Sequence, residues 1–406
     1  MPTRRSSLAA VVVAALALLV AGASAEAKRA KPIRLHISFP VPPGDLEVCE
    51  FVPVHVDGTY DMSNVAIKNI GFRSDFVSHH FLLYSYNGTN VADFPPEGTI
   101  VPDKACLNFG PSDRSARLLV GGSQGKSNIS NVPPAMAKEL ALKIPTVTGS
   151  DGKQIIGFIL NSHWINGSTK TRKATVRVKI NPAKPHTIRQ FVQPIFDVGA
   201  NIFIHVPPHS VAVTPTSGTL GPISWTGWAP GQPAAFAQLL GASQSPTGPA
   251  CVVMVTAHMH KRGKLFSVDY VPAGGAPQNV FQADDYTDPG QKLFDPPLLV
   301  SPGARLQYQC THDNGMTTPV KLGCEEKPGQ TPGQLIWAKR CSHLGPDPEE
   351  CTHQEGDGNR TFTGNCVEAN LVFGFTSDDE MCILPGTYYP ADPDHGCDLS
   401  SLPLLN

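Results

Sequence analysis

The chain is dominated by segments in which apolar and polar residues alternate, at least in part, with the two-residue period of a half-buried strand. β-Branched and aromatic residues are frequent in these segments, and turns rich in Gly and Pro separate them. Only 134–143 (PAMAKELALK) has the composition of a short helix. The pattern predicts an all-β protein of antiparallel β-sandwiches. The segments that carry it are 76–86, 154–164, 174–180, 252–259, 264–270, 305–309 and 370–375.

The predicted strands fall into two groups with a boundary near residue 190. Proline breaks the chain at 179–186 (KINPAKPH), and a new series of strands follows. We expect two tandem sandwich domains, 33–190 and 191–406, each of ordinary domain size. Within the second domain, the stretch 311–366 is polar, turn-rich and rich in cysteine, and no strand pattern is convincing there. It is predicted to be a disulfide-rich insertion.

Residues 1–25 have the pattern of a secretory signal peptide. Arg4 and Arg5 precede the apolar run 8–21, and the small residues 23–25 (Ala-Ser-Ala) offer a cleavage site. The run is too short to span a bilayer comfortably, and no later segment is apolar enough to do so. We therefore expect a secreted or periplasmic protein that is not held in a membrane once the signal is cleaved.

Charge and cysteine content agree with export and narrow the partners. The chain has 32 basic and 34 acidic residues, so it lacks the basic excess of proteins that bind nucleic acids or anionic membranes. Ten cysteines follow the predicted signal, and none of them lies in a CxxC pair. In an oxidising compartment this even number predicts up to five disulfides.

The first candidate chemistry lies in the second predicted domain. His258 and His260 are two residues apart in a predicted strand, so both imidazoles point to the same face and can converge on one metal ion. A surface or hydrogen-bonded pair would have the same spacing. Met381 follows another strand, and its thioether suits Cu(I) rather than zinc or magnesium. A single Met is usually a core residue, and this holds for Met381 unless Cys382 is tied to the sheet that carries the histidines. Cys310 is a plausible disulfide partner for Cys382.

A second candidate lies in the first predicted domain. His79 and His80 are neighbours in a predicted strand, and neighbouring strand residues face opposite ways. They can share a metal ion only if the backbone is irregular there or if they use different ring nitrogens. His163, at the end of a separate strand, could complete a set of three imidazoles, which suits copper or zinc.

The remaining histidines lack such a pattern, and we interpret them as turn or surface residues rather than ligands: His36, His55, His186, His205, His209, His312, His343, His353 and His395. The chain also lacks GxSxG, HExxH, GxGxxG and Walker-type motifs, so it offers no support for the chemistries that those motifs carry.

Four short motifs, in the order in which they follow one another along the chain, resemble those of the copper type II, ascorbate-dependent monooxygenases. This is the family of dopamine β-hydroxylase and peptidylglycine α-hydroxylating monooxygenase. They are SHHFLLY at 78–84, NSHW at 161–164, AHMHKRGK at 257–264 and DDEMC at 378–382. The resemblance covers roughly residues 33 to 400, without the predicted insertion. Each motif alone is weak, but the ordered set is specific.

The resemblance implies two copper ions with different roles. His79, His80 and His163 would hold the copper that supplies electrons, and His258, His260 and Met381 would hold the copper where O₂ binds and the C–H bond is cut. It further implies that ascorbate is the reductant and that a small organic substrate lies in a cleft between the domains. A thioether favours Cu(I), the state that must meet O₂.

The family pattern also implies a set of disulfides. Cys49–Cys106 would brace the strand of His79 and His80, and Cys310–Cys382 would hold Met381 in place. Cys251–Cys397 is a further expected pair. The remaining four cysteines would pair among themselves: Cys324, Cys341, Cys351 and Cys366.

The sequence departs from the family where substrate specificity is decided. Members that act on a C-terminal glycine have an Arg two residues before the His-x-His pair, and an Asn and a Tyr two and four residues after the Met. Thr256, Ile383 and Pro385 occupy these positions here, which argues against peptide amidation. The substrate is therefore not identified, and two other functions stay open: an exported copper-binding protein without catalysis, and a secreted zinc hydrolase using His79, His80 and His163.

Overall fold

The computed structural model describes residues 30–70, 76–86, 90–102, 117–124, 127–130, 132–133, 136–184, 186–207, 209–214, 246, 248–316, 371–373 and 380–405. Strands make up nearly all of its regular structure, with the short 3₁₀ turns η1 (Val91–Asp93), η4 (Gly199–Phe203) and η6 (Leu399–Ser401). Between described strands, every ladder is antiparallel except β8 with β12. The prediction of an all-β, antiparallel protein is confirmed. The part of the chain that the structure describes contains no helix with the length and hydropathy needed to cross a membrane.

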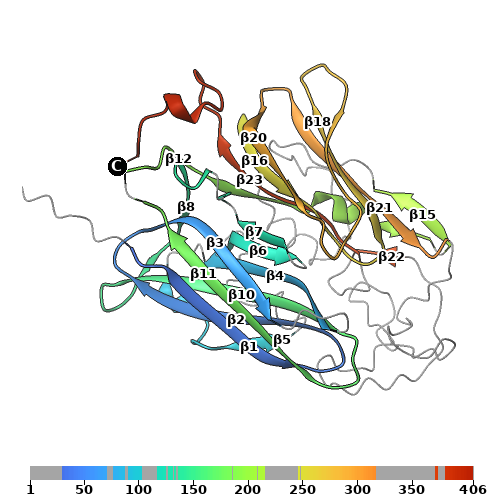
Figure 1. Ribbon diagram of the computed structural model, residues 1–406, viewed down its shortest axis with the longest axis horizontal. Coiled ribbons are helices and arrows are strands. Elements are labelled where there is room, and N and C mark those ends of the chain that lie inside the picture. The colour runs from blue at the N-terminus through green and yellow to red at the C-terminus, as the bar shows by residue number, and fades with distance from the viewer. Residues whose placement is uncertain are drawn as a thin grey trace, which may run out of the picture. The chain divides into compact units, whose positions relative to one another are not determined.

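Two sheets are built from residues 33–191 (Figure 1). The first has the order β1-β11-β3-β8-β12, with β1 (Ile33–Val41), β11 (Arg172–Pro182), β3 (Tyr60–Ile70), β8 (Leu140–Ile144) and β12 (Gln190–Phe191). The second has the order β5-β2-β10-β4-β6-β7, with β9 paired to β10. Its strands are β5 (Ile100–Pro102), β2 (Gly44–Val56), β10 (Gln154–Asn166), β4 (Phe76–Tyr86), β6 (Arg117–Gln124), β7 (Ser127–Ser130) and β9 (Val147–Thr148).

The alternation of apolar residues explains how these two sheets pack. In β1, Ile33, Leu35 and Ile37 are buried while Arg34 and His36 are exposed, because side chains alternate between the two faces of a strand. The buried residues join one hydrophobic core with residues of the second sheet, among them residues of β4 and β10. A shared core between two faces is the arrangement of a β-sandwich.

The remaining sheets are built from residues 193–390. One has the order β13-β23-β16-β20, with β17 paired to β23, and another has the order β15-β21-β18-β19. A short pair, β14 and β22, completes the set. Their bounds are β13 (Gln193–Asp197), β14 (His205–Val206), β15 (Ser210–Val213), β16 (Ala250–Thr256), β17 (His258–Met259), β18 (Gly263–Val271), β19 (Gln278–Ala283), β20 (Gln291–Val300), β21 (Arg305–Asn314), β22 (Leu371–Val372) and β23 (Cys382–Pro390).

Every residue of β16 is buried, and the reason is that it has a hydrophobic core on each face. Cys251 and Val253 belong to the core shared by the first two sheets, whereas Val252 and Val255 belong to the core of the later sheets. A strand covered on both sides reads as a continuous apolar run, as ACVVMVT does here. The chain from Lys31 to Asn406 is one compact unit, so the domain boundary near residue 190 stays a prediction.

Two sequence-based predictions of local structure were wrong. The expected helix at 134–143 is a turn at 136–139 followed by strand β8, while 134 and 135 lie outside the described residues. β8 pairs with β3 on one side and β12 on the other, and these tertiary ladders outweigh the helix propensity of Ala, Leu and Lys. The predicted start of the insertion at residue 311 is also too early, because β21 continues to Asn314. Residues 317–370 lie outside the described part.

The structure contains two of the expected disulfides, Cys251–Cys397 and Cys310–Cys382. Cys310–Cys382 joins the first residue of β23 to β21, and Cys251–Cys397 joins the chain just after β23 to β16. Cys106 lies outside the described residues, as do the four cysteines of the predicted insertion, so the pairings expected for them stay predictions.

Candidate metal centre

His79 and His80 lie on β4, beside β10, which carries His163. The register pairs His80 with His163 and then Ser78 with Trp164, so His79 is an extra residue in β4. Such a β-bulge turns two consecutive side chains toward one face. Both imidazoles are buried, with exposed fractions of 2% for His79 and 7% for His80. The irregular backbone that two neighbouring histidine ligands require is therefore present.

The three histidines of β4 and β10 form one group. Their rings lie 5.0 to 5.3 Å apart between centroids, and each offers a ring nitrogen within 4.8 Å of the others. The spacing suits imidazoles that surround a single metal ion. The structure thus brings together the set His79, His80 and His163 expected from the sequence.

A polar chain behind His80 orients its ring. Nε2 of His80 lies 3.0 Å from Oδ1 of Asn161, and the Asn161 amide donates to Glu47 Oε1 at 2.6 Å. Since the Asn161 oxygen accepts, Nε2 of His80 carries the proton and Nδ1 is left for a metal ion. Burial alone would raise the pKa of Glu47, but its contacts with His80, His163 and Asn161 lower it below the ordinary value.

His79 fits a metal better than it fits a hydrogen-bonded core. Among the described residues, neither of its ring nitrogens has a hydrogen-bond partner, and both are buried. Burial, and then the proximity of His163, His260, His80 and His258, holds its pKa well below the usual range, so the ring stays neutral. Neutral imidazole is the form that binds metals. Buried polar atoms without partners are costly, and a metal ion would satisfy the ring nitrogen of His79 that carries the free lone pair.

The second group starts with His258 and His260, which flank Met259 at β17. β17 pairs antiparallel with β23, with His258 opposite Ile383 and Met259 opposite Cys382. Directly opposite residues share a face of the sheet, so the two histidines face one way while Met259 faces the other. Continued by one residue, this register sets Met381 opposite His260. Met381 is 8% exposed.

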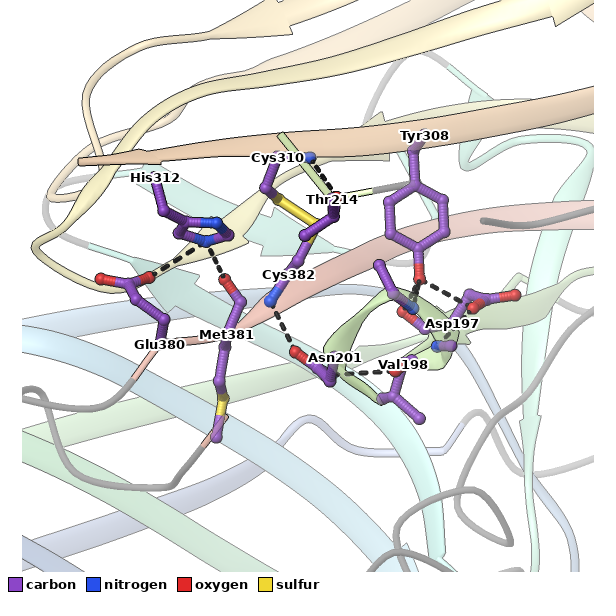
Figure 2. The surroundings of a disulfide bond; sticks show 12 residues. Asp197, Val198, Asn201, Thr214, Tyr308, Cys310, His312, Glu380, Met381 and Cys382 are labelled. Carbon is purple, nitrogen blue, oxygen red and sulfur yellow. Dashed lines mark hydrogen bonds and ion pairs between the residues drawn. A yellow bond between two sulfur atoms is a disulfide. The ribbon is translucent and has the colours of Figure 1, made fainter. Parts of the chain in front are cut away.

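Met381 is held on both sides (Figure 2). Cys382, the next residue, forms the disulfide with Cys310 of β21, and its backbone N–H donates to Oδ1 of Asn201 in η4 at 2.6 Å. Figure 2 shows the thioether of Met381 pointing away from the disulfide and from His312. This agrees with the strand alternation, which turns residues 381 and 382 to opposite faces.

The two groups share His79. His79, His258 and His260 also offer ring nitrogens within 4.8 Å of one another. The ring of His79 lies 5.7 Å from that of His258 and 5.3 Å from that of His260. Burial, and then the proximity of His260, His80 and His163, lowers the pKa of His258 well below the usual range. All five histidines thus form one buried cluster, which differs from the expected arrangement of two groups on either side of a cleft.

His312 was wrongly interpreted as a turn or surface residue. It lies in β21, is fully buried, and forms an ion pair with the buried Glu380, with Nε2 at 3.4 Å from Oε2. The signal was present in the sequence, because Tyr308, Cys310 and His312 occupy alternate positions of one strand and share its buried face. Asn161 and Glu380 lie within two of the four motifs, but neither they nor Glu47 were predicted to be partners of a histidine.

The other histidines agree better with the expectation. Those within the described residues are exposed, and two of them, His186 and His209, have the positive φ of turn residues. His343 and His353 lie outside the described residues. No protein-family model matches the chain, and no curated protein does so either. The resemblance to copper monooxygenases therefore rests on the four sequence motifs. The geometry of the histidine cluster is a separate observation.

Proposed function

We propose that the chain is an exported, copper-dependent monooxygenase that hydroxylates a C–H bond of a small organic molecule, with O₂ as oxidant and ascorbate as electron donor. The observation that carries the proposal is the cluster of buried, closely spaced imidazoles formed by three of the four motif segments. Copper would supply the activation of O₂ and the one-electron steps that such a hydroxylation needs.

The residues of the chain have separate tasks in this proposal. His79, His80 and His163 would bind one copper ion, with His80 held in its tautomer by Asn161. His258, His260 and Met381 would bind the other, and the thioether would favour Cu(I) there. Burial keeps His79 and His258 neutral at pH 7, so no proton needs to be displaced before either ring binds.

Export is part of the same proposal. Two disulfides within the described residues are typical of proteins that fold in an oxidising compartment, and the apolar run at 8–21 has the pattern of a cleavable signal. A secreted or a periplasmic location would satisfy both observations.

One observation favours a second candidate, an exported copper-binding protein without catalysis. The five imidazoles lie in one buried cluster. Ring centroids of the two groups are 5.3 to 5.7 Å apart, which is too close for a substrate to lie between these rings. In this candidate the same ligands would hold copper, but no organic substrate would increase the O₂ consumption that ascorbate drives.

Metal content is the first test. Protein exported through its own signal and loaded with copper should retain about two copper ions per chain, and His258→Ala should retain about one. His36→Ala, which removes an exposed histidine on β1, serves as the control and should retain the wild-type content. One copper or none in the wild type, or zinc retained in preference to copper, would contradict the monooxygenase proposal.

Oxygen uptake separates the two candidates. If the copper-loaded protein is an enzyme, ascorbate should drive O₂ consumption that increases when a library of small organic molecules contains a substrate. Two bound copper ions without substrate-dependent uptake across such a library would favour the copper-binding protein.

A further inference from the structure

Glu380 is a buried carboxylate that the proposed metal groups do not use. It precedes Met381 directly and has no exposed surface. A charged side chain in such a place is costly unless it is paired and hydrogen-bonded. Glu380 has such partners, because both of its oxygens accept backbone hydrogen bonds and His312 forms an ion pair with it.

Both oxygens of Glu380 hold the turn that follows the His-x-His pair. Oε2 accepts from the backbone N–H of His260 at 3.1 Å, and Oε1 accepts from the backbone N–H of Arg262. The turn is closed by the N–H of Gly263, which donates to the carbonyl of His260 at 3.0 Å. Hydrogen bonds to a carboxylate are shorter and stronger than neutral ones, so this turn is firmly attached to the chain beside Met381.

His312 anchors the carboxylate from the other side (Figure 2). Its Nε2 lies 3.4 Å from Oε2 of Glu380 and 3.5 Å from the backbone carbonyl of Met381. His312 lies on β21, two residues after Cys310, whose disulfide to Cys382 fixes the residue that follows Met381. The backbone of Met381 is therefore fastened to β21 at two points, through an ion pair and through a disulfide.

We propose that Glu380 and His312 are positioning residues that set the distance between His260 and Met381, so that both can bind the same copper ion. The inference rests on the proposed function, because it takes these two residues and His258 as ligands. His260 and Met381 are far apart in sequence, and Glu380 contacts the segments of both directly. A metal site tolerates only small errors in ligand position, so a rigid connection between the two segments is needed.

Glu380 and His312 act through the backbone and not as ligands. Both carboxylate oxygens already accept hydrogen bonds from His260 and Arg262, and Nε2 of His312 faces the carboxylate and the carbonyl of Met381. Figure 2 shows the Met381 thioether on the opposite side of its backbone from His312. Removing either side chain would therefore keep all three ligands, His258, His260 and Met381, but would make the distances between them less well fixed.

The test uses full-length protein loaded with Cu(I), without substrate. Glu380→Gln keeps the shape of the side chain but loses the charge and one acceptor, which leaves a buried N–H of the turn without its partner. We expect its Cu(I) affinity at one site to fall about 10- to 100-fold, the usual effect of losing a partner that orients ligands. We also expect the copper–sulfur scattering in its X-ray absorption spectrum to weaken, while the copper–nitrogen scattering is retained.

Two comparisons make the result specific. Met381→Ala should abolish the sulfur scattering completely, which calibrates the signal, and Glu139→Gln, a change in a partly exposed carboxylate that pairs with Arg189, should leave it unchanged. Glu380→Asp restores a charge on a shorter side chain and should recover part of the affinity. Such partial rescue would not follow if residue 380 only filled space.

The outcomes distinguish this inference from the function on which it rests. If the wild type shows no copper–sulfur scattering, the ligand set fails, and the positioning role fails with it. If the wild type shows that scattering and folded Glu380→Gln keeps both the scattering and the affinity, only the positioning role is overturned. If Glu380→Gln does not fold, His312→Gln gives the same comparison with the hydrogen bonds to the turn intact, and a smaller loss is expected. Failure of both variants to fold would overturn the proposal, because the pair would then support the whole sheet.

Discussion

At the scale of single residues, His79 has the central place in the candidate metal centre. It is the extra residue of a β-bulge, it belongs to both groups of three histidines, and the surrounding imidazoles and burial lower its pKa. His163 by contrast belongs to one of these groups. Substitution at the two positions should therefore have different consequences.

We predict that His79→Ala removes the copper ion held with His80 and His163 and also weakens binding at the other site, because the His79 ring lies 5.3 to 5.7 Å from those of His258 and His260. His163→Ala should remove about one of two copper ions and leave the other site near its wild-type affinity. Metal content after dialysis, together with Cu(I) competition titrations, measures both. His36→Ala is again the control. If His79→Ala, like His163→Ala, left the second site near its wild-type affinity, His79 would have no influence on that site.

A second residue-scale prediction concerns Gly263, which closes the turn after His260. A Cβ at this position would lie 2.7 Å from both Cβ and Sδ of Met259, a residue buried in the core. Gly263→Ala should lower the free energy of unfolding by about 1–3 kcal/mol, the usual cost of overpacking. Urea denaturation measures it. Gly248→Ala, where a Cβ meets nothing within 4 Å, is the matched control and should be close to neutral. A neutral Gly263→Ala would mean that the turn is not closely packed.

At the scale of elements, β23 connects the parts of the candidate centre. It lies between β13 and β16, pairs with β17, and starts at Cys382, next to Met381. Figure 1 shows it running beside β16. One disulfide joins its first residue to β21, and another joins the chain after it to β16. The two disulfides thus stabilise the same strand, but only one of them is next to a proposed ligand.

This difference gives a third prediction, with its own control. Replacing Cys310 and Cys382 by Ala should lower the free energy of unfolding by about 4 kcal/mol, because the disulfide closes a chain separation of 72 residues. It should also weaken Cu(I) binding at the Met381 site. Replacing Cys251 and Cys397, which are separated by 146 residues, should destabilise the fold by about 5 kcal/mol.

The second pair of substitutions should leave Cu(I) affinity unchanged at a temperature where the protein is still folded. Thermal or urea denaturation and competition titration give the two quantities independently. If both pairs of substitutions lowered copper affinity in proportion to stability, the Cys310–Cys382 disulfide would have no specific role in placing Met381.

At the scale of the whole molecule, the buried ionisable groups make stability depend on pH. His79 and His258 have pKa values lowered by burial and by neighbouring histidines, so the unfolded chain binds more protons than the folded one once the pH falls below about 6.5. Glu47 and Glu380 also have lowered pKa values, so the stability that they contribute is lost as the pH falls below about 4.3.

We therefore predict that the metal-free protein loses stability as the pH falls from about 7 to about 5, and loses more below about 4.3. Urea denaturation at a series of pH values measures this. The variant with both His79→Ala and His258→Ala should have a weaker dependence in the upper part of this range. Constant stability of the wild type between pH 7 and pH 5 would contradict the lowered pKa values of these histidines.

Much of the fold was predictable because strand formation leaves a local pattern. The segment 76–86 was expected as a strand and is β4 with the same bounds, and 154–164 lies within β10. The pattern misled at Leu140–Ile144, where residues of high helix propensity form a strand between β3 and β12. Ladders to distant segments decided that conformation, and no window of local sequence contains them.

By itself, the sequence determined which side chains are available for the metal centre. The spacing of His258 and His260 was enough to place them on one face, because side chains of a strand alternate with a period of two. Only the tertiary structure decided how the groups meet. The bulge at His79 depends on the register with β10, and the contacts of Glu380 with His260 and His312 join segments 120 and 68 residues away. Such contacts depend on chain folding and packing, which leave no periodic signal in the sequence.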